Sequence, residues 1–179
     1  MSKYYTGIGS RDVTETEFSI MSQLAQHFAT AGWTLRSGGA GGADSAFEKG
    51  CALAEGYAEI FIPWKGFGTK VENPNCRRYV PDERSFGKAA HYLVENGIIP
   101  WFSNMTQGAQ KLHSRNYYQV LGVDNIKSNV MVYCAEDDKH GIPKGGTRTA
   151  ILLARSFGVS TYNIRVPKQL SELKEVIYE

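Results

Sequence analysis

The chain has 179 residues, of which 42% are hydrophobic and 21% charged, and its formal net charge is +2. This length suits one well-buried domain, and we expect residues 1–179 to form a single one. The small net charge argues against a strongly basic, dedicated nucleic-acid binder. The first residues lack the apolar core of a signal peptide, and no apolar run reaches membrane-spanning length. We therefore expect a cytoplasmic protein with no membrane partner.

Short β-rich runs alternate with amphipathic helices along the chain. The first strand is predicted at Tyr4–Ile8, and a capping box formed by Thr14 and Glu17 begins a helix that Gly32 closes. The other predicted strands are Trp33–Arg36, Glu59–Ile62, Val130–Tyr133 and Ser160–Ile164. The other helical segments are predicted at Ala43–Glu55, Arg84–Asn96, Thr106–Leu121, Ala150–Phe157 and Leu170–Ile177. This alternation predicts an α/β fold of three layers, a mainly parallel sheet with helices on both faces.

The stretch Pro63–Pro81 interrupts this alternation, because it is rich in glycine, proline, asparagine and charged residues. A connection of this length is usually functional, and we expect a long loop or lid over residues 63–83. Its aromatic residues are interleaved with cations, so Trp64 and Phe67 are candidates for stacking on a base. The alternative is a surface lid whose aromatic side chains cover the edges of the core.

Three glycine-rich turns lie where a predicted strand is followed by a predicted helix. They are Gly7–Arg11, Ser37–Asp44 and Pro143–Thr149. Glycine lets the backbone approach a ligand closely, and a helix start offers unpaired N–H groups and a partial positive charge. In a parallel sheet the three turns share the carboxyl edge, so together they predict a site for a phosphate-bearing small molecule.

Common nucleotide and metal motifs are absent. A G-x-G-x-x-G fingerprint would need glycine at Asp12, and no Walker loop is present, so neither dinucleotide redox chemistry nor ATP hydrolysis is favoured. Cys51, Cys76 and Cys134 are far apart and lack C-x-x-C spacing, which predicts neither disulfides nor a zinc site. We expect no metal and no cofactor.

The turns resemble those of the SLOG superfamily, a Rossmann-like nucleotide-binding group that includes the LOG phosphoribohydrolases and the DNA-processing protein DprA. Gly7–Arg11 is similar to its first turn, and Leu35–Asp44 resembles the S-G-G-A-x-G-x-D turn of the DprA-like branch. His113–Asn116 resembles the arginine-bearing helix of the LOG branch, and Pro143–Thr147 resembles a shortened form of its P-G-G-x-G-T turn. The resemblance implies a Rossmann-like domain that binds a nucleotide and forms a homodimer or higher homo-oligomer.

The resemblance and the turns together give a set of candidate residues. Arg36 and Lys144 are further cations in or beside the turns. The predicted nucleotide- and phosphate-binding residues are Gly9, Ser10, Arg11, Ser37, Gly38, Gly39, Gly41, Gly42, Arg115, Asn116, Gly145, Gly146, Thr147 and Arg148.

One departure from the LOG pattern bears on catalysis. LOG enzymes carry a glutamate three residues after the threonine of the last turn, and this chain has Ala150 there. Asp44 and Glu48 are the candidate substitutes for the missing catalytic carboxylate. The alternative is that Asp44 caps its helix and Glu48 is exposed one turn later.

These observations favour a protein that senses or sequesters a nucleotide or nucleotide-derived molecule, including a cyclic nucleotide signal, without turning it over. The first alternative is a LOG-like hydrolase of the N-glycosidic bond of nucleoside monophosphates. The second is DprA-like binding of single-stranded DNA, which the chain's scattered cations do not favour.

Overall fold

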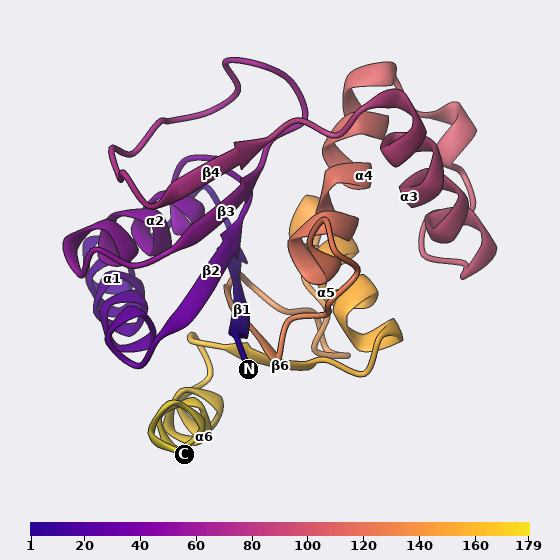
Figure 1. Ribbon diagram of the computed structural model, residues 1–179. Coiled ribbons are helices and arrows are strands. Elements are labelled where there is room, and N and C mark those ends of the chain that lie inside the picture. Colours follow the sequence, from indigo (N-terminus) through magenta and orange to yellow (C-terminus); the bar gives the residue numbers. More distant parts are fainter.

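In the computed structural model, which describes residues 1–179, six parallel strands form one sheet in the order β4-β3-β2-β1-β5-β6 (Figure 1). The chain moves outward in one direction from β1 to β4 and then returns to place β5 on the other side of β1. The strands are β1 (Lys3–Gly9), β2 (Trp33–Ser37), β3 (Ala58–Phe61), β4 (Cys76–Tyr79), β5 (Val130–Cys134) and β6 (Ser160–Asn163).

Six α-helices and one short 3-10 helix complete the fold. They are α1 (Glu15–Thr30), α2 (Ala43–Leu53), α3 (Glu83–Glu95), η1 (Phe102–Asn104), α4 (Gln107–Leu121), α5 (Gly145–Ser156) and α6 (Pro167–Tyr178). Thr14 and Glu17 form the predicted capping box at the start of α1. None of the helices combines the length and the apolarity needed to cross a membrane.

Two hydrophobic cores lie on opposite faces of the sheet, as the alternation of side chains in β5 illustrates. Val130 and Val132 belong to a core with residues of α1, α2 and α6. Met131 and Tyr133 belong to a second core with residues of α3, α4 and α5. The predicted α/β fold of three layers is therefore confirmed, and Figure 1 shows the two groups of helices on either side of the sheet.

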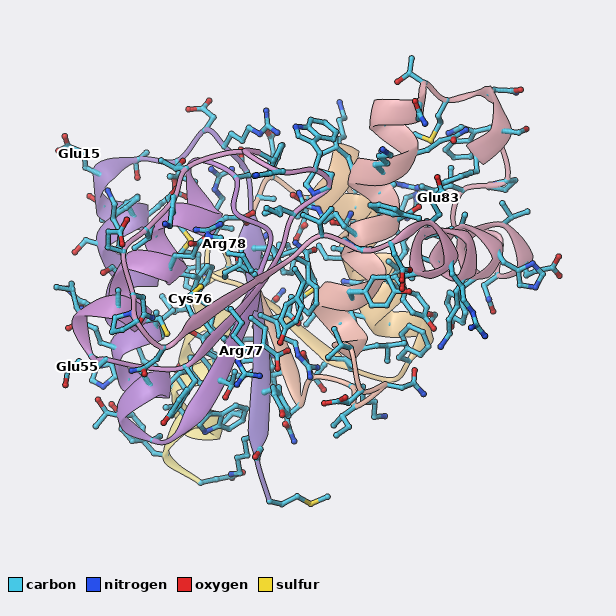
Figure 2. The ribbon with its side chains drawn as sticks, turned by 45° about the horizontal axis from the view of Figure 1, so that its top comes forward. Glu15, Glu55, Cys76, Arg77, Arg78 and Glu83 are labelled. Atoms are coloured by element: carbon cyan, nitrogen blue, oxygen red, sulfur yellow. The ribbon has the colours of Figure 1, made fainter.

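The expected loop over residues 63–83 is wrong in one part, because Cys76–Tyr79 forms the edge strand β4, paired with β3. This strand has four residues, two of them the cations Arg77 and Arg78, and none is fully buried. Short, charged edge strands are typical of protected sheet edges, and their sequences lack the apolar signal of central strands. Figure 2 shows the side chains of this strand.

Candidate functional site

A pocket of about 290 Å³ opens at the carboxyl end of β1, the strand next to which the strand order reverses. Open α/β sheets bind their ligands at this position, because the connections on either side diverge and leave a crevice. We call it the switch-point pocket. It is lined by Ile8, Gly9, Ser10, Arg11, Ala40, Asp44, Leu112, His113, Arg115, Asn116, Gln119, Gly146 and Thr147.

The first glycine turn forms one wall of the pocket and is fixed to its neighbours by backbone hydrogen bonds. The amide of Ser10 donates to the carbonyl oxygen of Cys134 (2.8 Å), and the amide of Ala43 donates to that of Ser10 (3.0 Å). A Cβ atom at Gly9 would lie 2.3 Å from the Cys134 oxygen, so only glycine allows β1 and β5 to approach here. The turn thereby positions Ser10 and Arg11 at the pocket.

The second glycine turn reaches the pocket only through Ala40 and Asp44. The carboxylate of Asp44 accepts a hydrogen bond from the amide of Ala40 (3.1 Å), which folds the turn back on the start of α2. Gly42 has a φ of +72°, and a Cβ atom there would lie 2.5 Å from the carbonyl oxygens of Ser10 and Arg11. The other candidates of this turn do not line the pocket; they are Ser37, Gly38, Gly39, Gly41 and Gly42.

The third turn places the start of α5 against the pocket. Gly146 and Thr147 line it, whereas Gly145 and Arg148 do not. The residue before the helix, Lys144, provides no side-chain cap, so the first amides of α5 remain available to an anion. The side chain of Asn116 donates to the carbonyl oxygen of Gly146 (3.1 Å) and ties α4 to this turn.

Arg115 lies beneath the second turn with only 7% of its surface exposed. Its Nη1 donates to the carbonyl oxygens of Gly38 (2.6 Å) and Phe61 (3.0 Å), and its Nε donates to that of Leu112 (3.2 Å). The side-chain amide of Gln119 is oriented so that its nitrogen donates to Asn116 Oδ1. Its oxygen then accepts hydrogen bonds from the backbone amide of Gly38 and from Arg115 Nη1. Arg115 thus supports the turn as well as lining the pocket.

Positive charge dominates the pocket wall. Arg11 is exposed, Arg115 is buried, and Asp44 is the one carboxylate among the lining residues. Burial raises the pKa of Asp44, and the nearby Arg115 opposes that rise. His113 Nδ1 lies 2.8 Å from the hydroxyl of Thr149, and burial together with Arg115 lowers the pKa of the imidazole. A neutral imidazole and two guanidinium groups therefore face an entering ligand.

The alternative in which Asp44 caps α2 and Glu48 is exposed is wrong. Asp44 does not cap α2, because the helix begins after Gly42 without a side-chain cap and Asp44 binds the amide of Ala40 instead. Glu48 is 4% exposed, and its Oε2 lies 2.8 Å from Arg78 Nη2. Glu48 does not line the switch-point pocket, which leaves Asp44 as the carboxylate that could contact a ligand there.

Two further positions are structural. Arg36 points into the layer of α4 instead of the sheet edge: its Nε lies 3.0 Å from Glu59 Oε2, and its Nη1 donates to the carbonyl oxygen of Ile126. Arg36, although it is next to the second glycine turn in the sequence, is therefore engaged away from the switch-point pocket. Ala150, which stands where LOG enzymes have the glutamate, is a residue of α5 and is fully buried in the core.

The lid aromatics lie at the edge of this site. The Phe67 ring centroid is 5.8 Å from the Arg11 guanidinium carbon and 5.5 Å from that of Arg115. Trp64 contacts Phe67 edge to face, with 5.4 Å between the ring centroids. The amide of Thr69 donates to the carbonyl oxygen of Gly39 (3.1 Å), so the segment is fixed to the second turn.

Sequence reasoning missed several residues of α4 and β1 that line the pocket. They are Ile8, Leu112, His113 and Gln119. The sequence carries no signal for them, because the burial of the polar residues Ser114, Arg115, Asn116 and Gln119 of α4 is seen only in the folded chain. Buried polar residues on one helix usually serve hydrogen bonding or a ligand.

No protein-family profile and no curated protein sequence matches the chain. Among solved structures, the molybdenum cofactor carrier protein of Chlamydomonas reinhardtii is similar, with a TM-score of 0.55, 16% identity, and coverage of 98% of this chain and 84% of the carrier. DNA processing protein A of Helicobacter pylori is also similar, with a TM-score of 0.55 and 17% identity; the match covers 90% of this chain and 64% of that protein's chain. The chain therefore shares the Rossmann-like fold of these proteins.

Proposed function

We propose that this chain, with its Rossmann-like fold, binds a nucleotide or nucleotide-derived small molecule through a phosphate in the switch-point pocket. It would act as a sensor or a sequestering protein. Two fold neighbours support ligand binding on this scaffold: one is named a molybdenum cofactor carrier, and the other a protein that binds single-stranded DNA. Their ligands differ, so the choice for this chain depends on its own pocket.

The observation that carries the proposal is the convergence of the uncapped start of α5 with Arg11 and Arg115 on one pocket. Helix-start amides and guanidinium groups are the donors that proteins use for phosphate. Charge-assisted hydrogen bonds contribute roughly 1.5–3 kcal/mol each, and micromolar affinity needs about 8 kcal/mol. The volume of about 290 Å³ suits part of a small molecule better than an extended strand.

Asp44 keeps N-glycosidic hydrolysis as a second candidate function. Its carboxyl group lines the same pocket as the two arginines, and burial raises its pKa. A carboxyl group in this state could stabilise a developing oxocarbenium ion when ionised, or protonate a departing base when neutral. Against this role, Asp44 already accepts the amide of Ala40 and so supports the second turn.

The proposal can be tested with two arginines of equal charge. Arg11 is exposed and lines the pocket, whereas Arg148 lies near the start of α5 outside it. We expect Arg11→Ala to weaken binding of AMP and of ribose 5-phosphate about tenfold in calorimetric titrations, and Arg148→Ala to leave both unchanged. Equal losses in the two variants would indicate non-specific attraction and overturn the proposal.

The same samples distinguish binding from hydrolysis. Chromatography of AMP after long incubation should recover it intact with the wild-type protein. Release of adenine and ribose 5-phosphate, abolished in Asp44→Asn while AMP binding persists, would replace the binding function with the hydrolytic one.

A further inference from the structure

A series of side-chain hydrogen bonds follows the face of α4 that lines the switch-point pocket. Asn116 and Gln119 are three residues apart in this helix, so their side chains are neighbours on one face. Gln119 Nε2 donates to Asn116 Oδ1 (2.9 Å). Both residues line the pocket, yet they are only 4% and 2% exposed, so their hydrogen bonds form away from bulk water. Figure 1 shows α4 beside α5.

The two ends of this series reach different glycine turns. At one end, Asn116 Nδ2 donates to the carbonyl oxygen of Gly146 in the third turn (3.1 Å). At the other end, the side-chain oxygen of Gln119 accepts from the backbone amide of Gly38 in the second turn (3.1 Å). Three hydrogen bonds therefore connect the two turns through α4. We call Gly38, Gln119, Asn116 and Gly146 the turn bridge.

The Gly146 end of the turn bridge acts on the proposed phosphate site. The carbonyl group of Gly146 and the N–H group of Thr147 belong to one planar peptide group, so holding the oxygen fixes the direction of the N–H. This N–H is among the first amides of α5, which has no side-chain cap. Both polar atoms of the Asn116 side chain are already engaged within the protein. Asn116 is therefore placed to orient a phosphate donor.

The Gly38 end of the turn bridge lies next to the contact that fixes the lid segment. Gly38 has no positive φ, but a Cβ atom there would overlap the side chains of Gln119 and Arg115, so glycine is required by close packing. The carbonyl oxygen of the next residue, Gly39, accepts from the amide of Thr69 in the lid (3.1 Å). The same short piece of backbone thus bonds to α4 on one side and to the lid on the other.

We propose that Asn116 and Gln119 are positioning residues that hold the start of α5 in place for the phosphate and couple phosphate binding to the lid segment. This inference rests on the proposed function and adds a form of regulation to the same site. A phosphate that fixes the Gly146–Thr147 peptide group restricts the series of hydrogen bonds that holds Gly38. Opening of the contact between Gly39 and Thr69 then becomes less favourable.

A double-mutant cycle tests the positioning role, with ribose 5-phosphate as the probe in calorimetric titrations. Asn116→Ala and Gln119→Met should each weaken binding about tenfold, and the double variant should bind no worse than either, because one change already breaks the series. Two independent contacts to the ligand would instead multiply to a loss of about a hundredfold, which would overturn the proposal.

The matched control is Gln110→Met, at another glutamine of α4. Gln110 donates to the carbonyl oxygens of Phe102 and Met105 and does not line the switch-point pocket. This variant should bind ribose 5-phosphate with unchanged affinity. An equal loss of affinity in Gln110→Met would assign the effect to general loosening of α4 and overturn the proposal. Urea denaturation of each variant first establishes that it is folded, and either single variant suffices for the next measurement.

Hydrogen exchange at the Thr69 amide, followed by NMR, tests the coupling. Saturating ribose 5-phosphate should slow this exchange about fivefold in the wild type and leave it unchanged in Asn116→Ala or Gln119→Met. A ligand that contacts the lid directly would slow the exchange in all of them, and that result would overturn the inference.

The two levels of the argument fail in different ways. If ribose 5-phosphate binds the wild type but does not change the exchange at Thr69, the coupling is wrong and the phosphate site stands. If calorimetry detects no binding to the wild type, the proposed function fails, and the inference fails with it.

Discussion

Nη1 of Arg115 lies 2.6 Å from the carbonyl oxygen of Gly38, which joins the arginine of α4 to the second glycine turn. The same nitrogen also donates to the carbonyl oxygen of Phe61 at the end of β3. A residue suggested by resemblance as a phosphate ligand thus also supports the backbone that shapes the site. Changing it should affect stability and binding together.

We therefore predict that Arg115→Lys lowers the free energy of unfolding by about 2 kcal/mol, since a lysine cannot reproduce the guanidinium fork and leaves buried carbonyl groups unpaired. Urea denaturation of the variant measures this. Arg148→Lys, outside the pocket, should change stability by less than about 0.5 kcal/mol. Unchanged stability in Arg115→Lys would show that the contacts to Gly38 and Phe61 contribute little.

Substitutions at Gly146 and Gly41 distinguish what the fold requires from what ligand binding requires. A Cβ atom at Gly146 or at Gly41 would meet no other atom within 4 Å, and neither has a positive φ, but only Gly146 lines the switch-point pocket. Gly146→Ala should raise the thermal midpoint slightly, because alanine favours helix, and weaken AMP binding about tenfold by narrowing the anion site.

The control for that prediction is Gly41→Ala, which should preserve both the thermal midpoint and AMP binding. Calorimetric titration of the two variants side by side provides the measurement. Full affinity in Gly146→Ala would mean that the phosphate does not approach the start of α5.

Regular patterns in the sequence identified most of the fold. The capping box at Thr14 fixed the start of α1, and the apolar run of β5 identified a central strand. The strand Cys76–Tyr79 was not predicted because two of its four residues are arginines and none is fully buried, so it lacks an apolar run. An edge strand pairs with only one neighbouring strand, and its sequence therefore shows only a weak strand pattern.

The sequence predicted where in the fold the site lies, but not which side chains line it. Three glycine turns at one sheet edge follow from the alternation of strands and helices. Which atoms face the pocket depends on close packing. The carbonyl oxygen of Gly38 accepts a hydrogen bond from Arg115, and Gly42 packs against the carbonyl oxygens of the first turn. The polar face of α4, including His113 and Gln119, required the arrangement of three distant segments.

The ion pair between Glu17 and Arg165 joins the start of α1 to the segment before α6. Arg165 Nε lies 2.5 Å from Glu17 Oε2, and this hydrogen bond is the main reason that the pKa of Glu17 falls to about 2. Glu17→Gln keeps the capping geometry but removes the charge, so it should cost about 1 kcal/mol at pH 7. Glu17→Ala should cost about 2 kcal/mol, because the cap is lost as well.

The pH dependence of this pair has a defined sign. The pKa of Glu17 is lower in the folded protein than its ordinary value of 4.5, so the stabilisation is complete above that value and is lost as the pH falls toward 2. Urea denaturation of wild type and Glu17→Gln should therefore give curves that converge in acid. A difference that persists at pH 2 would assign the effect to packing.

Glu48 should have the opposite pH dependence. Burial is the main cause that raises its pKa to about 7, and the negative charge of Asp44 adds to the rise, while Arg78 opposes it. One of its oxygens has no hydrogen-bond partner. Because the folded pKa exceeds the ordinary 4.5, the group contributes stability below pH 4.5 that is lost as the pH rises through about 7.

Glu48→Gln, which cannot ionise, should therefore become more stable relative to wild type between pH 5 and pH 8, by a change on the order of 3 kcal/mol. Chemical denaturation at both pH values measures it. Glu175→Gln, at an exposed position of α6, should show no such change. Repeating the comparison with Asp44→Asn tests the cause, because removing that negative charge should lower the pKa of Glu48 and shrink the change. An unaltered change would leave burial as the sole cause and exclude coupling between the pocket carboxyl group and the Glu48–Arg78 pair.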